Sequence, residues 1–140
     1  MGIAEAVNKR VTCVRHKIGV VIVVNGRVVG TGYNGPPKGF PHCSDIGCLR
    51  NELNIPSGEQ QQKCRAVHGE QNALIQAAAN RAELEGATLY SEFYPCIICT
   101  KMIINAGIKR VVYKNRYPNE LGEEMFKTAG IELCRLEGGE

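Results

Sequence analysis

Two short motifs constrain the fold of this 140-residue chain more than any other feature. His68-Gly69-Glu70 begins one predicted helix, and Pro95-Cys96-Ile97-Ile98-Cys99 begins the next. Two cysteines three residues apart at a helix start can point at one ion, and the free backbone N–H groups and positive dipole end there stabilise the thiolate form that binds metal. If both motifs serve one ion, the fold must bring two helix starts together.

His68, Cys96 and Cys99 are the candidate ligands. A tetrahedral zinc with three protein ligands keeps its fourth position for water, as catalytic rather than structural sites do, and zinc lowers the pKa of such a water to near neutrality. Glu70 is predicted to face that water as the proton carrier and not as a ligand. The order H-x-E followed by P-C-x-x-C is typical of zinc deaminases, which remove an amine from a nucleobase.

An alternative interpretation makes Cys96 and Cys99 half of a structural zinc knuckle or a redox pair, with His68 as a core histidine. Either motif alone would leave that interpretation open. The two motifs together, each at a helix start, favour the catalytic site. A redox pair is disfavoured further because it explains neither His68 nor Glu70.

The remaining pattern indicates alternating strands and helices. Residues 18–24 form a continuous β-branched run, Asn25-Gly26 is a strong hairpin signal, and residues 27–33 resume the strand pattern. Residues 34–63 hold eight Gly and Pro residues, too many for long regular structure. The other predicted elements are helices at 4–13, 71–80, 96–106 and 121–129, and strands at 86–90, 110–113 and 131–136. Such alternation implies an α/β layer architecture.

Four further segments carry a family resemblance: 31–37 (TGYNGPP), 41–43 (PHC), 71–73 (QNA) and 106–110 (AGIKR). With the metal motifs, they make the chain resemble the cytidine and deoxycytidylate deaminase superfamily, most of all its dCMP deaminase branch, over nearly the whole length. The resemblance implies a three-layer α/β fold, a mixed sheet of about five strands flanked by helices, in a single domain over residues 1–140. It also implies a homo-oligomer, commonly a hexamer, that converts dCMP to dUMP and ammonia, with dCTP as activator and dTTP as inhibitor.

Two substrate contacts follow from the same resemblance. Asn34 is expected to contact the sugar or base, and Tyr117 to close over the nucleotide; the alternatives are a turn residue and a packed aromatic. The chain departs from the family pattern at Gly69, where alanine is usual and glycine is expected to loosen the helix start. It also departs at residues 92–94, which are expected to alter the pocket rim or a subunit contact.

A second, structural zinc is also expected, because members of this branch often carry one. We expect Cys13, Cys43, Cys48 and Cys64 to close a tetrahedral site that pins the 34–63 segment to the first helix, with His42 as the substitute ligand. The alternative is that two or more of these cysteines are free thiols. Cys134, in the last predicted strand, is expected to lie in the core.

Charge and composition restrict the partners. The net charge is +3, Lys and Arg form no block of five, and aromatic residues make up 6% of the chain, which disfavours a nucleic-acid polymer. No apolar run reaches the about eighteen residues of a membrane helix, and no export signal begins the chain, so the cytoplasm is the expected location. Rival substrates are cytidine, dCTP and a tRNA adenosine, and a rival class is a non-catalytic zinc- or nucleotide-binding module, against which Glu70 argues. The candidates for a phosphate contact are Lys38, Arg65 and Arg116.

Overall fold

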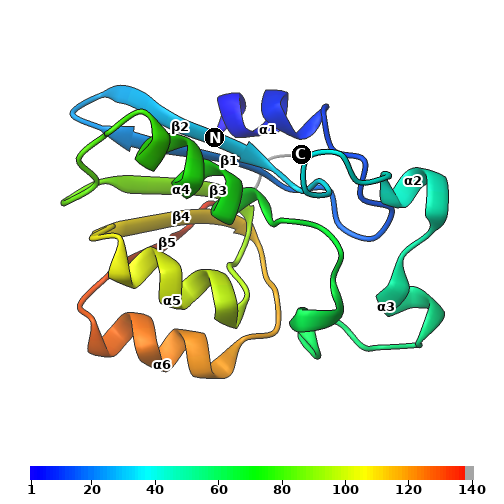
Figure 1. The fold of residues 1–140 in the computed structure, drawn as a ribbon. Coiled ribbons are helices and arrows are strands. Elements are labelled where there is room, and N and C mark those ends of the chain that lie inside the picture. The colour runs from blue at the N-terminus through cyan, green and yellow to red at the C-terminus, as the bar shows by residue number, and fades with distance from the viewer. Residues whose placement is uncertain (138–140) are drawn as a thin grey trace.

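The computed structural model describes residues 1–137, and a five-stranded mixed sheet forms the centre of this part of the chain (Figure 1). The spatial order is β2-β1-β3-β4-β5. β1 pairs antiparallel with both β2 and β3, whereas β3, β4 and β5 run parallel. The strands are β1 (Gly19–Val24), β2 (Arg27–Tyr33), β3 (Thr88–Phe93), β4 (Arg110–Asn115) and β5 (Glu132–Arg135). The expected fold class is confirmed.

The hairpin between β1 and β2 forms where its turn residues predicted it. Asn25 has φ 49° and Gly26 has φ 73°, so both central residues take the left-handed conformation that a two-residue hairpin turn needs. Asparagine and glycine tolerate that region better than other residues do. The hairpin carries residues 30–34 back to the end of the sheet where the candidate ligands lie.

Helices cover both faces of the sheet and complete three layers (Figure 1). α1 (Gly2–Asn8) packs on one face against β1 and β2, and α4 (Gly69–Ala79), α5 (Ile97–Asn105) and α6 (Glu120–Thr128) lie on the other. The core lies between the sheet and these three helices. Its strand side chains alternate with a period of two, as expected for one face of a sheet: Val20, Ile22, Leu89 and Val111.

Glycines in β2 allow α4 to approach the sheet closely. A Cβ atom on Gly32 would lie 2.0 Å from the carbonyl oxygen of Gly69, and one on Gly30 would lie 2.5 Å from that of Ala73. Gly69 is itself buried, with the site of its missing Cβ 3.0 Å from Cγ2 of Val20. Close packing against two strands therefore holds the helix start that was expected to be loosened by Gly69.

The segment 34–63 contains only short helices: α2 (Cys43–Ile46), α3 (Leu49–Glu52) and the 3-10 turn Gln61–Lys63. Side chains hold it in place. The buried guanidinium of Arg50 donates to the carbonyl oxygens of Pro56 and Glu59, and the hydroxyl of Tyr117 accepts from the backbone nitrogen of Gly58. The prediction that no long regular structure occurs here is confirmed.

Two local predictions were wrong. The first helix ends at Asn8, not at residue 13, because the backbone nitrogens of Arg10 and Val11 bond to carbonyls three residues back and tighten the chain into a turn. Cys13 thus lies in the loop that leads to β1. Cys134 is half-buried rather than a core residue, since β5 is an edge strand.

Among residues 1–137, no helix combines the length and the hydropathy needed to cross a bilayer.

Candidate metal centre

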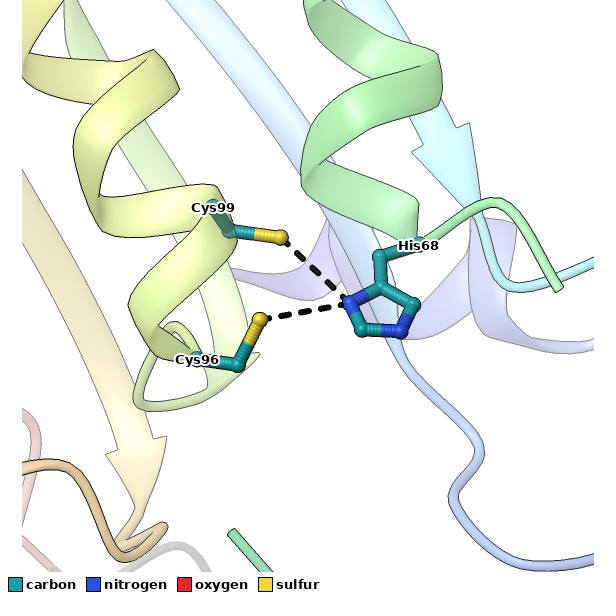
Figure 2. A group of neighbouring side chains, drawn as sticks. All are labelled: His68, Cys96 and Cys99. Carbon is teal, nitrogen blue, oxygen red and sulfur yellow. Dashed lines mark hydrogen bonds between the residues drawn. The ribbon is translucent and has the colours of Figure 1, made fainter. Parts of the chain in front are cut away.

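The starts of α4 and α5 bring three potential metal ligands together (Figure 2). His68 and Cys96 are the residues that cap the two helices, and their extended backbones (ψ 156° and 168°) turn both side chains toward the space between the helix ends. Nδ1 of His68 lies 3.4 Å from Sγ of Cys96 and 3.4 Å from Sγ of Cys99. Within residues 1–137, this is the one group of three or more His, Cys, Asp or Glu side chains at metal-ligand spacing.

The spacing of this group fits zinc. Zinc–sulfur bonds of about 2.3 Å and zinc–nitrogen bonds of about 2.0 Å at tetrahedral angles separate nitrogen from sulfur by about 3.5 Å. The two observed separations of 3.4 Å are close to that value. An imidazole and two thiolates are also a donor set that zinc prefers.

Glu70 lies beside the ligand group without belonging to it. Its side chain is 2% exposed, and Oε2 accepts a hydrogen bond from Sγ of Cys99 at 3.7 Å. Burial raises the pKa of Glu70 to about 6, against the opposing effect of the nearby His68. A carboxyl group with a pKa near neutrality can both accept and donate a proton at physiological pH.

The ligands also perturb one another's protonation. The hydrogen bond from Cys99, together with the smaller effect of His68 and against the effect of burial, lowers the pKa of Cys96 to about 4. Burial alone would lower the pKa of His68, but hydrogen bonds with the Cys64 and Cys96 thiols raise it to about 11. The side chains therefore favour a thiolate facing a protonated imidazole. A metal ion that binds here must displace the imidazole proton, so metal affinity falls with acid.

Two side-chain amides hold the start of α4. The side-chain oxygen of Gln71 accepts from the backbone nitrogen of His68 at 2.9 Å. The side-chain oxygen of Asn34 accepts from the backbone nitrogen of Gly69 at 2.7 Å, and Nδ2 of Asn34 donates to the carbonyl oxygen of His16 at 3.4 Å. Asn34 is thereby committed largely to bonds within the protein.

A cavity of about 40 Å³ adjoins the ligand group, large enough for water. Asn34 and Tyr117, the two expected substrate contacts, both line it together with His68, Glu70 and Cys96. Tyr94, from the segment that departs from the family pattern, is in the same wall. The ring of Tyr117 packs edge-on against His16 with centroids 5.6 Å apart.

Sequence reasoning missed three cationic or donor side chains of this wall, namely Arg15, His16 and Arg50. Arg15 and His16 lie in the loop just before β1. Because β1 pairs antiparallel with β3, the start of β1 lies beside the end of β3, where Cys96 follows. That pairing was the available signal for the first two residues. Nothing in the sequence marked Arg50. The candidates Lys38, Arg65 and Arg116 are exposed and do not line this cavity.

The expected second set of ligands is gathered less tightly. Cys13, Cys48 and Cys64 line the same cavity, and burial raises the pKa of Cys43, with the charges of those three thiols adding to the effect. Their sulfurs do not form a group at ligand spacing in the described part of the chain. His42 hydrogen-bonds through Nδ1 to the hydroxyl of Thr12 at 2.8 Å.

Comparison with known proteins shows the family to which a chain with this site belongs. Residues 1–115 match the model of the cytidine and deoxycytidylate deaminase zinc-binding region. The chain belongs to the cytidine and deoxycytidylate deaminase family. His68, Cys96 and Cys99 of this deaminase-family chain thus form a zinc site, since the matched region is zinc-binding and the group fits the ion.

Individual relatives agree with the family. The deoxycytidylate deaminase of Mycobacterium phage D29 is 43% identical, with 81% of this chain and 89% of the phage protein covered. That of Schizosaccharomyces pombe is 35% identical over 95% of this chain, but the chain spans only 41% of its length. Among solved structures, dCMP deaminase from the cyanophage S-TIM5, in complex with dCMP and dUMP, superimposes with a TM-score of 0.77 at 30% identity, covering 96% of this deaminase-family chain and 92% of the other.

Proposed function

We propose that this chain catalyses the hydrolytic, zinc-dependent deamination of dCMP to dUMP with release of ammonia. The observation that carries the proposal is the position of Glu70, buried beside Cys99 and in the wall of the cavity that the zinc ligands border. A structural zinc has no use for a neighbouring proton carrier. The phage relatives named as deoxycytidylate or dCMP deaminases support dCMP as the substrate.

The side chains divide the reaction between them. Zinc, when bound, supplies the Lewis acidity that makes water nucleophilic at neutral pH. Glu70 takes a proton from the attacking water and delivers it to the ring nitrogen next to the amine-bearing carbon. It then takes the proton of the hydroxyl group newly formed on that carbon and delivers it to the departing amine, which leaves as ammonia while the carbonyl forms. Its raised pKa suits both directions of transfer. Asn34 and Gln71 keep the start of α4 in place, so that His68 and Glu70 hold a fixed relative position.

The test uses purified protein, dCMP, dCTP, deoxycytidine and cytidine, and follows the loss of cytosine absorbance. We expect dCMP to be turned over with the highest kcat/KM. Glu70→Gln should lower turnover by at least about 100-fold, because it removes a general acid–base group, while zinc content stays unchanged. Glu83→Gln, at an exposed glutamate, is the control. Full activity of Glu70→Gln would refute the mechanism, and a preference for cytidine would refute the substrate.

A second zinc held by Cys13, Cys43, Cys48 and Cys64 is part of the proposal. The mutual effect of these thiols on the pKa of Cys43, and the shared cavity wall, support it. Binding would require the loops that carry them to draw together by a small shift, with His42 as the substitute ligand. Metal analysis should give two zinc ions per wild-type chain and one in Cys43→Ala. One ion in the wild type would rule the second site out.

We further propose that residues 1–140 form a single domain that assembles into a homo-oligomer, with the hexamer of related enzymes as the expected state, and that dCTP activates and dTTP inhibits it. Exposed apolar side chains on adjacent helices support assembly: Ile75 on α4 is 56% exposed and Met102 on α5 is 37% exposed. Light scattering measures the number of chains in the assembly, and a monomer would refute the homo-oligomer.

Assays of dCMP turnover with added dCTP and dTTP test the proposed regulation. The cytoplasmic location and the exclusion of nucleic-acid polymers stay predictions.

A further inference from the structure

The two helix starts that carry the zinc ligands are held in different ways. On α4, two side-chain amides accept hydrogen bonds from the first backbone N–H groups. On α5, the N-cap residue is Cys96, and within residues 1–137 its side chain makes no capping hydrogen bond. The thiol is turned toward His68 instead (Figure 2). The first turn of α5 therefore depends on other groups for its support.

Asn119, the N-cap residue of α6, supplies support from outside α5. The two helices pack against each other (Figure 1). The side-chain nitrogen Nδ2 of Asn119 donates to the carbonyl oxygen of Pro95 at 2.9 Å and to Oγ1 of Thr100 at 3.1 Å. Oγ1 of Thr100 donates in turn to the carbonyl oxygen of Cys96 at 3.0 Å. A continuous hydrogen-bond network thus runs from α6 to the backbone of the first zinc ligand on α5.

These bonds fix the direction in which the two thiols project. The carbonyl of Pro95 and the N–H of Cys96 belong to one planar peptide group, so a hydrogen bond to that carbonyl also orients the backbone from which the Cys96 side chain leaves. Thr100 directly follows Cys99 in the chain, and its side chain is fully buried. The network is therefore attached on both sides of the ligand pair.

The side-chain amide of Asn119 performs two tasks at once. Its Oδ1 accepts from the backbone nitrogen of Gly122 at 2.9 Å and so caps α6. Aspartate or serine would cap a helix about as well as asparagine. Only an amide, however, offers an accepting oxygen at one end and two donor hydrogens at the other. Gly122 leaves room for this orientation, because a Cβ atom there would lie 1.9 Å from Nδ2.

We propose that Asn119 is a positioning residue for the zinc site, which holds the thiols of Cys96 and Cys99 in the geometry that the ion requires. Asn119 is not among the residues that line the cavity beside the ligands, so it acts through the backbone of α5. Removal of a group that orients a metal ligand typically lowers metal affinity by about 10- to 100-fold. The inference rests on the zinc site of the proposed function and deepens it, and metal binding tests it without substrate.

A competing role for Asn119 is structural alone. As the cap of α6, it would stabilise the packing of α6 on α5 without any effect on the ion. The two roles need different ends of the side chain, because capping needs Oδ1 whereas positioning needs Nδ2. Asn119→Asp separates them, since a carboxylate keeps the accepting oxygen and removes the donor.

The experiment measures the zinc affinity of the wild type, Asn119→Asp and the control Asn105→Asp by competition with a chromogenic chelator. The ion of this site is identified as the one that Cys99→Ser lacks. Affinity should fall by about 10- to 100-fold in Asn119→Asp. It should stay unchanged in Asn105→Asp, which makes the same change at an exposed residue of α5. The new carboxylate at position 119 would by its charge alone favour a cation, so weaker binding reports the lost donor.

Two further measurements separate positioning from capping. Cobalt bound in place of zinc reports ligand geometry through its visible absorption, which should change in Asn119→Asp and match the wild type in Asn105→Asp. Denaturant unfolding of the metal-free proteins should show similar stability for these two variants, because the cap of α6 is kept. Unchanged zinc affinity in Asn119→Asp, or a loss confined to the stability of the metal-free protein, would overturn the proposal.

If Asn119→Asp does not fold, Thr100 carries the test. Thr100→Val removes the hydroxyl that links Asn119 to Cys96 while nearly keeping the shape of the side chain, and Thr100→Ser keeps the hydroxyl. Zinc affinity should fall in the valine variant and be retained in the serine variant, so equal affinities would overturn the proposal. Zinc-loaded wild type that does not turn over dCMP refutes the proposed function itself, an outcome distinct from unaltered metal affinity in the variants.

Discussion

The side-chain oxygen of Asn34 and the backbone nitrogen of Gly69 are 2.7 Å apart, and this buried hydrogen bond joins the end of the hairpin to the first turn of the helix that presents His68 and Glu70. A residue that was expected to contact substrate thus holds the start of α4, which carries one zinc ligand and the proposed proton carrier. The positioning role can be tested without substrate, because loss of the hydrogen bond to Gly69 should change the stability of the protein.

Replacement of Asn34 by alanine should lower the free energy of unfolding by about 1–3 kcal/mol, since it leaves the buried N–H of Gly69 without an acceptor. Asn34→Asp keeps an acceptor oxygen and should lose less. Urea denaturation measures both, with the exposed Asn105→Ala as control. If Asn34→Ala were as stable as the control, the bond to Gly69 would have no positioning role.

Substitution of Cys99 by serine should remove one zinc ion per chain and abolish turnover, because two remaining ligands cannot hold the ion in catalytic geometry. Cys134→Ser removes a half-buried thiol far from the group and should retain both zinc and activity. Removal of metal from the wild type with a chelator should lower Tm, since an ion that binds only the folded state stabilises it. Metal analysis and thermal unfolding check these outcomes, and full zinc content in Cys99→Ser would contradict them.

A methyl group at Gly32 should destabilise the protein by about 1–3 kcal/mol or more, because it would lie 2.0 Å from the carbonyl oxygen of Gly69 and push α4 off the sheet. Activity should fall as well, since α4 carries His68 and Glu70. Gly2→Ala, where the added Cβ has open space around it, should change stability by less than about 0.5 kcal/mol. Equal melting temperatures for the two variants would show that α4 can move away at no cost.

The hydroxyl of Tyr94 predicts a dependence of stability on alkaline pH. It is buried, it has no hydrogen-bond partner among the described residues, and burial raises its pKa to about 12 from an ordinary value of 10. The unfolded chain therefore loses this proton at lower pH than the folded one, so the contribution is intact below pH 10 and is lost as the pH rises toward 12.

Tyr94→Phe removes the titrating group and the unsatisfied hydroxyl while keeping the edge-on packing against Tyr113 and Phe126. We expect the variant to be at least as stable as the wild type at pH 7, and to lose less stability between pH 10 and 12. Denaturant unfolding of both proteins across this range measures the difference. If the free energy of unfolding of the two proteins changed equally between pH 10 and 12, the pKa of Tyr94 would not be raised by folding.

The sequence predicted those features that depend on a single short segment of the chain. Asn25-Gly26 specified the hairpin turn because few other residues adopt two successive left-handed conformations. Cys96 and Cys99 were recognisable as a ligand pair because their spacing sets their geometry on one helix start, and Gly107, at φ 86°, ended that helix as predicted. The predicted end of α1 was wrong because apolar spacing does not reveal where backbone N–H groups bond to the carbonyl three residues back and end the α-helix.

Only the tertiary structure decided which distant side chains share a cavity. Arg15 and Arg50 belong to a loop and to an irregular insertion, and their positions beside His68 depend on strand pairing and on contacts with Tyr117 that no local pattern encodes. The tertiary structure also decided that the side chain of Cys134 is only half-buried, because β5 lies at the edge of the sheet. The sequence by itself thus marked the zinc ligands, because short-range spacing sets their geometry, whereas long-range packing decided which cationic side chains border the cavity beside them.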